Sequence, residues 1–223
     1  MALNVAIDGP AGAGKSTIAK EVAKELGYIY VDTGAMYRAI ALYLIRNGVK
    51  AEENELISEK CKEADVTIEY VDGKQVVFLN GEDVNGFIRT EEVGSMASSS
   101  STNQDVRKRL LGLQRELAEK NDVIMDGRDI GTNILPNAQA KIYLTASIEV
   151  RAKRRYDELV AKGIECDYEE IKKEIAIRDE RDMNREIAPL RQAKDAVLLD
   201  SSELSVEEVK ERMIQIIKSK IEK

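Results

Sequence analysis

The stretch Gly9-Pro10-Ala11-Gly12-Ala13-Gly14-Lys15-Ser16 decides how the rest of this chain is interpreted. It has the form G-x-x-x-x-G-K-[ST], the P-loop pattern, which is informative when a strand precedes it and a helix follows. Residues 4–8 form a short apolar run that predicts a buried strand. Residues 17–26 carry apolar side chains at helical spacing, and Gly27 predicts the end of that helix. Both conditions for a P-loop are therefore met.

The residue types of this stretch suit a bound polyphosphate. Glycines let the backbone approach phosphate oxygens closely, because no Cβ blocks the way. The backbone N–H groups and the helix N-terminus attract negative charge. Lys15 can reach the β- and γ-phosphates, and the Ser16 hydroxyl can ligate Mg²⁺. The pattern thus indicates a nucleoside triphosphate, and the alternative is a glycine-rich turn that binds nothing.

Length and composition limit the class of protein. The 223 residues are enough for one large α/β domain or for one domain with an insert, and 43% of them are hydrophobic. No apolar run is long enough to span a bilayer, and no basic and apolar leader stands at the start. We therefore expect a cytoplasmic protein without a membrane partner.

Charge and rare residues exclude several kinds of site. The net charge of −7 argues against a nucleic-acid polymer as partner. The chain has no histidine, and its two cysteines, Cys61 and Cys166, lie far apart, which argues against a zinc site and against histidine-based catalysis. Arginines crowd into residues 151–191. They indicate either recognition of a small, multiply charged anion or salt bridges on helix surfaces.

Strands and helices alternate along most of the chain. After the first strand, further strands are predicted at residues 28–32, 122–126, 141–145 and 196–200. Helices are predicted at residues 35–46, 53–63, 147–162 and 168–182 and from residues 103 and 205 onward, and Thr33-Gly34 is expected to be a turn. This order predicts a parallel α/β sheet whose ligands lie at the carboxyl ends of its strands.

Residues 57–100 interrupt that alternation. Apolar and polar residues alternate from Val66 to Tyr70, and Asp72-Gly73 and Asn80-Gly81 are hairpin turn signals. We predict a small antiparallel sheet within an insert rather than an independent domain. The run Ser98–Ser101 that follows could be only a flexible polar connector.

Charged residues follow the third predicted strand. Asp126 ends an apolar run, where P-loop proteins usually place a carboxylate on the magnesium side, although it could simply cap a turn. The Arg128 guanidinium could bind a phosphate, and the Asp129 carboxylate could accept a hydrogen bond from a base or sugar. Alternatively, the two residues could form a salt bridge with each other.

Another group of charged residues lies at 178–185, in the C-terminal part of the chain. In a helix, Arg178, Asp182 and Arg185 share one face, which could be a ladder of ion pairs on a solvated surface. Together with a P-loop, the same arginines suit direct phosphoryl transfer between two bound nucleotides, which needs positioning and charge neutralisation. They could close over the phosphates when both substrates are present.

Taken end to end, the chain resembles the bacterial cytidylate (CMP) kinases, which are nucleoside monophosphate kinases. The resemblance rests on I-D-G-P-A-G-A-G-K-S from Ile7, D-T-G-A-M-Y-R from Asp32, R-T-E-E-V from Arg89, D-G-R-D-I-G-T from Asp126 and R-D-E-R-D-M-N-R-E-I-A-P-L from Arg178. It implies one P-loop kinase domain over 1–223, an α/β fold with a five-stranded parallel sheet flanked by helices. It also implies an antiparallel-sheet insert at 57–100 that binds the acceptor nucleotide, and a helical lid at 151–185.

The resemblance also implies roles for individual residues. ATP, the phosphoryl donor, would be bound by Gly9, Pro10, Ala11, Gly12, Ala13, Gly14, Lys15, Ser16 and Thr17, and Mg²⁺ by Ser16 and Asp126. The acceptors CMP and dCMP would be bound by Thr33, Arg38, Ser98, Arg107, Arg128, Asp129, Arg178, Asp182 and Arg185, with Ser99 as an alternative register for Ser98. Lys15, Arg128, Arg178 and Asp182 would be catalytic, and the enzyme would be a monomer.

Two other functions compete with this interpretation. A P-loop kinase could act on another small acceptor, such as UMP, dTMP or shikimate. A nucleotide-gated switch could instead bind a partner protein, but no N-K-x-D segment for reading guanine is present. Against UMP stands Asp129, whose carboxylate could accept a hydrogen bond from the cytosine amino group but would face an oxygen of uracil.

Overall fold

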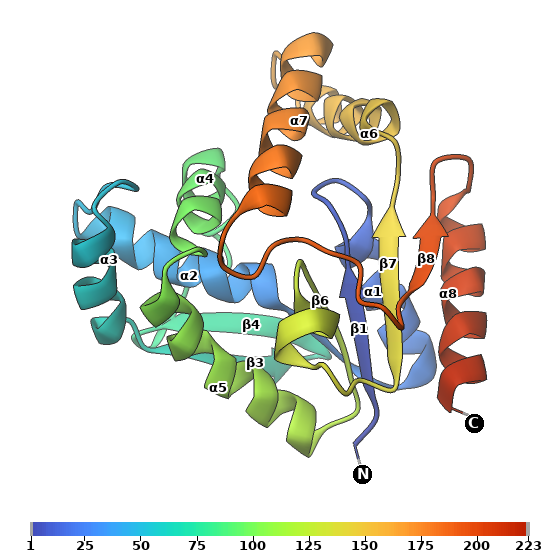
Figure 1. The fold of residues 1–223 in the computed structure, drawn as a ribbon. Helices are drawn as coiled ribbons and strands as arrows, with labels where there is room; N and C mark the ends of the chain where they lie inside the picture. Colours follow the sequence, from blue (N-terminus) through green and yellow to red (C-terminus); the bar gives the residue numbers. More distant parts are fainter. Residues whose placement is uncertain (1, 222–223) are drawn as a thin grey trace. The chain divides into compact units, whose positions relative to one another are not determined.

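The computed structural model describes residues 2–221 and contains two β-sheets (Figure 1). The larger sheet is parallel and has five strands in the order β2-β6-β1-β7-β8. The bounds of its strands are β1 Asn4–Asp8, β2 Ile29–Asp32, β6 Val123–Gly127, β7 Ala140–Thr145 and β8 Val197–Asp200. In the register of β1 and β7, Asp8 lies opposite Tyr143. The predicted five-stranded parallel sheet is confirmed.

The chain divides into two compact units. We call the first the P-loop unit, which consists of residues 3–28 and 124–223, and the second the central unit, which consists of residues 29–123 together with Ala2.

The P-loop unit contains helices as well as strands. They are α1 Lys15–Leu26, α6 Ile148–Ala161, α7 Tyr168–Asn184 and α8 Val206–Ile221, with a short π-helix at Ile130–Ile134. In α1, Ile18 and Val22 are four positions apart and both are buried, which is the spacing of one helical face. Gly27 ends α1 with a left-handed φ of 74°, and its N–H donates to the Ala23 carbonyl.

The central unit combines helices with the smaller sheet. Its helices are α2 Thr33–Arg46, α3 Asn54–Lys60, α4 Glu91–Ser100 and α5 Gln104–Lys120, with a 3₁₀ turn at Cys61–Glu63. Its antiparallel strands are β3 Val66–Val71, β4 Lys74–Leu79 and β5 Glu82–Asp83. Asp72-Gly73 and Asn80-Gly81 have positive φ angles at both positions, as two-residue hairpin turns require. The predicted antiparallel sheet and its turns are confirmed.

One local expectation is wrong, and one alternative that the sequence left open is excluded. Thr33-Gly34 is not a turn but the start of α2, because the Asp32 carboxylate accepts from the Ala35 N–H at 2.8 Å and so caps the helix before Thr33. The serine run is not a flexible connector, since α4 continues through Ser100. Serine hydroxyls can bond to carbonyls of the preceding turn, and the Ser100 hydroxyl donates to the Met96 carbonyl at 2.8 Å.

None of the helices within residues 2–221 is both long enough and apolar enough to cross a membrane.

Candidate active site

The phosphate loop between β1 and α1 depends on its glycines. Gly9 has a φ of 150°, and a Cβ built there would lie 1.9 Å from the carbonyl oxygen of Leu144 in β7. Gly12 and Gly14 have φ angles of 75° and 89°, which L side chains rarely adopt. Side chains are therefore disfavoured at three positions of the loop. At Gly12 and Gly14 the reason is the φ angle, and at Gly9 it is both the φ angle and the nearby Leu144 carbonyl.

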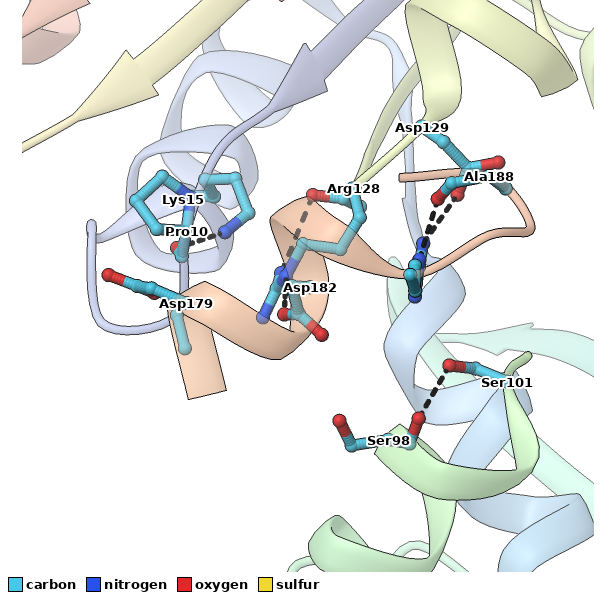
Figure 2. A network of polar contacts seen from close by, with 12 residues as sticks. Pro10, Lys15, Ser98, Ser101, Arg128, Asp129, Asp179, Asp182 and Ala188 are labelled. Atoms are coloured by element: carbon cyan, nitrogen blue, oxygen red, sulfur yellow. Dashed lines mark hydrogen bonds and ion pairs between the residues drawn. The ribbon is translucent and has the colours of Figure 1, made fainter. Parts of the chain in front are cut away.

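Lys15 lies in this loop with its side chain buried. Its residue is only 6% exposed, and Nζ donates to the Pro10 carbonyl at 2.7 Å (Figure 2). Burial lowers the pKa of Lys15 to about 7, and the charge of Arg128 adds to that effect. A bound polyphosphate would supply the negative charge that favours the protonated ammonium.

Ser16 and Asp126 meet beside the loop. The Ser16 hydroxyl donates to Asp126 Oδ2 at 2.7 Å, and Asp126 is buried near the end of β6. Hydroxyl and carboxylate oxygens are ligands that Mg²⁺ accepts. No cluster of three or more histidine, cysteine or acidic residues within residues 2–221 could hold a metal by itself. The donor set fits Mg²⁺, which usually takes one or two protein oxygens, with waters and substrate phosphates completing its shell.

The loop after β6 meets the end of α7 through two ion pairs. Arg128 Nε donates to Asp182 Oδ2 at 2.9 Å, and Arg185 Nη2 lies 3.5 Å from Asp129 Oδ1. Figure 2 shows the Arg128 side chain directed at Asp182. Burial opposes ionisation of Asp182, but Arg128 and the other nearby arginines outweigh it and hold its pKa below the usual value. Arg128 and Asp129 thus each pair with a distant residue.

The segment from Arg178 to Arg185 is not a solvated ladder. Asp182 is 3% exposed, and its ion pair reaches Arg128, 54 positions away. Arg178 lies in α7, whereas Arg185 is the C-cap of that helix. Arg185 Nε also donates to the carbonyl of Ala188 at 2.6 Å. One face of the end of α7 is therefore buried and polar within the P-loop unit.

In the central unit, the predicted residue Arg38 belongs to an ion cluster. Arg38 Nη2 lies 3.2 Å from Asp32 Oδ2, and Arg89 Nη2 lies 2.7 Å from the same oxygen. Burial opposes ionisation of Asp32, but the two arginines hold its pKa below the usual value. Thr33, the next residue, is buried at the start of α2. Sequence reasoning assigned no role to Asp32 or Arg89, although both lie in the quoted motifs.

Ser98 and Arg107 also lie in the central unit. Ser98 is buried in α4, and its hydroxyl has no hydrogen-bond partner among the described residues. A buried polar group without a partner is costly, so its presence points to a ligand or a water. Arg107 Nη1 donates to the Ser101 carbonyl at 3.4 Å, and its guanidinium lies 5.9 Å from the centre of the Tyr37 ring.

Sequence reasoning missed three buried charged residues of the P-loop unit, namely Arg151, Asp179 and Asp8. Arg151 in α6 pairs with Asp179 in α7 at 2.6 Å, and its guanidinium donates to the carbonyls of Ala11 and Ala146. Arg151 and Asp179 are 3% and 5% exposed. The sequence shows both only as members of charged helices, so neither had a signal. Asp8 did have a signal in the sequence, because it ends an apolar strand and directly precedes the first glycine of the loop.

Comparisons with known proteins agree on one family. A family model described as cytidylate kinase matches residues 5–219. A cytidylate kinase from Caldicellulosiruptor bescii is 53% identical over 214 residues, which cover 96% of this chain and 95% of that protein. A cytidylate kinase from Bacillus subtilis is 47% identical over 218 residues, covering 98% and 97%. A solved structure of an uncharacterized protein from Eubacterium ventriosum is 15% identical, with a TM-score of 0.55 and coverages of 97% and 99%, and it supports the fold alone.

Proposed function

The chain belongs to the cytidylate kinase family, and we propose that it transfers the γ-phosphoryl group of ATP to CMP or dCMP. The products are ADP and CDP or dCDP. The buried Lys15 of the phosphate loop carries the proposal. It is 6% exposed and its side chain donates to the loop carbonyl of Pro10, and besides burial the charges of Arg128 and Arg178 lower its pKa. Like charges gathered at a phosphate loop are stabilised by a polyanion, such as a phosphoryl group in transfer.

The donor nucleotide is assigned to the phosphate loop, residues 9–17. The glycine conformations leave its backbone open to close approach by phosphate oxygens, and the N-terminus of α1 favours their charge. Lys15 would exchange the Pro10 carbonyl for the β- and γ-phosphates. Ser16 and Asp126 would hold Mg²⁺, which would neutralise phosphate charge when bound.

Roles toward the acceptor nucleotide are proposed residue by residue, as the family resemblance implies them. In the P-loop unit, Arg128 would bind the CMP phosphate, Asp182 the ribose, and Asp129 with Arg185 the cytosine. Residues of the central unit would contribute further contacts: Arg38 to the phosphate, Thr33 to the ribose, and Ser98 and Arg107 to the base. The buried Ser98 hydroxyl, without a partner among the described residues, supports a base contact at Ser98 rather than Ser99.

The transfer itself needs little covalent help from the protein. A phosphate oxygen of CMP forms a bond to the γ-phosphorus as the bond from that phosphorus to the bridging oxygen of ADP breaks. The attacking oxygen is already ionised, so no general base is required. Lys15, Arg128 and Arg178 would neutralise the charge on the transferring group, with Arg178 acting from the proposed lid, residues 151–185.

Base selectivity follows from the chemistry of Asp129. An ionised carboxylate only accepts hydrogen bonds, and the cytosine amino group donates them. Uracil presents an oxygen at that position, which would leave two acceptors facing each other. We therefore propose that CMP and dCMP are preferred to UMP.

Steady-state kinetics with CMP, dCMP, UMP, dTMP, AMP and shikimate at fixed Mg-ATP test the proposal. We expect the highest kcat/KM with CMP or dCMP. A higher value with UMP, dTMP or shikimate would assign the chain another acceptor. Slow hydrolysis of nucleotide without stimulation by any acceptor would favour a nucleotide-gated switch.

Several expectations from the sequence stay predictions. They are the binding of the acceptor by the insert at 57–100, the action of 151–185 as a lid, the cytoplasmic location and the monomeric state. The exclusion of nucleic-acid polymers and of membranes as partners also stays a prediction.

A further inference from the structure

Asp8 is a buried carboxylate to which the proposed reaction gives no role. It is the last residue of β1 and is 4% exposed. Its Oδ1 accepts from the Ile130 backbone N–H at 2.7 Å, and its Oδ2 accepts from the Gly131 N–H at 2.8 Å. These contacts join residues 122 and 123 positions apart in the chain.

This pair of contacts needs a carboxylate. Two neighbouring N–H groups donate to two different oxygens of one side chain, and only aspartate or glutamate offers two acceptor oxygens in this arrangement. Asparagine would keep one acceptor, while its NH₂ group would face the other N–H donor. Hydrogen bonds to an ionised acceptor are also stronger than neutral ones.

Gly131 makes the fit around Asp8 close. A Cβ added at residue 131 would lie 3.3 Å from Asp8 Oδ2 and 3.2 Å from Cδ of Lys141. Lys141 cannot easily yield, because its Nζ is held by the Pro136 carbonyl and the Asp195 carboxylate. A methyl group at residue 131 would therefore press on the Asp8 carboxylate without removing its charge.

Asp8 connects two loops with different tasks. It directly precedes Gly9, the first residue of the phosphate loop, and its two donors directly follow Asp129, the proposed reader of cytosine. We infer that Asp8 is a positioning residue that holds the loop of Arg128 and Asp129 in place for the acceptor nucleotide. The inference rests on the proposed function and adds a specificity determinant outside the residues that would touch the substrate.

The phosphate loop has restraints of its own. Gly9 packs against the Leu144 carbonyl, and Lys15 is held by the Pro10 carbonyl. Loss of the Asp8 contacts should therefore displace the acceptor loop more than the donor loop. Removing the Asp8 charge also affects Lys15, whose pKa Asp8 helps to raise, so a second variant that keeps the charge is needed.

The test uses Asp8→Asn and Gly131→Ala, with Asp65→Asn and Gly112→Ala as matched controls. Asp65 is an exposed carboxylate, and a Cβ at Gly112 would meet nothing within 4 Å. We expect both test variants to lose at least tenfold in kcat/KM for CMP, mainly through KM, and to lower the CMP/UMP ratio of kcat/KM. In Gly131→Ala, which keeps the Asp8 charge, the Kd for ATP without acceptor should change less than twofold, and the controls should match the wild type.

The outcomes separate this inference from the proposed function. A wild-type protein that does not phosphorylate CMP would refute the proposed function itself. If the wild type is active and both test variants keep its CMP/UMP ratio of kcat/KM and its KM for CMP, that result would overturn the role of Asp8, even if the variants melt at a lower temperature. A loss of ATP affinity in Gly131→Ala as large as its loss in kcat/KM for CMP would also overturn it. If Asp8→Asn does not fold, Gly131→Ala decides by the same criteria.

Discussion

Two loops of the P-loop unit follow buried strands of one sheet, yet they are held in different ways. The phosphate loop after β1 takes its shape from glycine conformations and from a contact between Lys15 and Pro10, five positions apart. The loop after β6 takes its contacts from distant residues, since Arg128 pairs with Asp182 and the Ile130 N–H donates to Asp8. The glycine conformations of the first loop are thus a matter of local sequence, although Arg151 also donates to its Ala11 carbonyl, whereas the contacts of the second loop come from tertiary structure.

The two loops should therefore respond differently to substitutions. A change of the Lys15 side chain should alter chemistry while the fold persists, because its hydrogen bond to the Pro10 carbonyl stays within the loop. A change among the distant pairs should alter stability or selectivity, because each pair joins two or three segments through buried charges. Substitutions at the two kinds of contact test that contrast.

Lys15→Ala is expected to lower kcat by about 10³-fold, as loss of one preorganised charge-stabilising group does. The fold should persist, since Lys15 contacts mainly its own loop. Steady-state turnover and circular dichroism measure the two effects. Lys24→Ala, at an exposed position of the same helix, is the control. Turnover within tenfold of the wild type would contradict the assignment of Lys15.

Arg151→Met should destabilise the protein by about 3–5 kcal/mol, because it leaves Asp179 buried without its charged partner. Urea unfolding measures this free energy. The double variant Arg151→Met/Asp179→Leu lacks both charges. Its loss in free energy of unfolding should be smaller than the sum of the losses in Arg151→Met and in Asp179→Leu. Additive losses would show that the pair does not act as a unit.

Asp8 should make stability depend on pH. Burial raises its pKa from 3.8 to about 6, so the folded state binds a proton more tightly than the unfolded state does. This contribution to stability is fully present below pH 4 and is lost as the pH rises through 6, and the shift corresponds to about 3 kcal/mol. We expect the stability of the wild type relative to Asp8→Asn to fall by roughly this amount between pH 4 and pH 7.5. A difference that does not vary with pH would contradict the raised pKa.

Asp129→Asn should reduce the CMP/UMP ratio of kcat/KM by about five- to 150-fold, which corresponds to the 1–3 kcal/mol of an unpaired buried polar group. The amide can donate to uracil, so activity with UMP should suffer less than activity with CMP. Parallel kinetics with both acceptors measure the ratio, and Asp65→Asn is the control. An unchanged ratio would remove Asp129 from base recognition.

Thr90→Ala should cost about 1 kcal/mol, as the loss of a helix cap usually does. The Thr90 hydroxyl accepts from the Val93 N–H three positions later, so the contact is as local as those of the phosphate loop. Thr90→Ser keeps the hydroxyl and should keep most of the stability. Urea unfolding of both variants gives the difference, and equal losses would show that the hydroxyl is not what matters.

Much of the fold could be predicted because its signals are local. The phosphate loop, the hairpin turns at Asp72-Gly73 and Asn80-Gly81 and the end of α1 at Gly27 each depend on residues a few positions apart. The one error and the one excluded alternative are local as well. Thr33-Gly34 has the residue types of a turn, but the Asp32 carboxylate caps a helix that begins there. The serine run has the composition of a connector, but it lies in α4, where the Ser100 hydroxyl bonds to the Met96 carbonyl.

The sequence by itself determined the P-loop, the order of strands and helices and the resemblance to the cytidylate kinases, which the comparisons confirm. Only the tertiary structure decided which charges meet: Arg128 with Asp182, Arg151 with Asp179, and Asp8 with two backbone N–H groups. The physical reason is that glycine conformations and turns depend on neighbouring residues. The partner of a buried charge is instead chosen by three-dimensional packing, which spacing along the chain does not reveal.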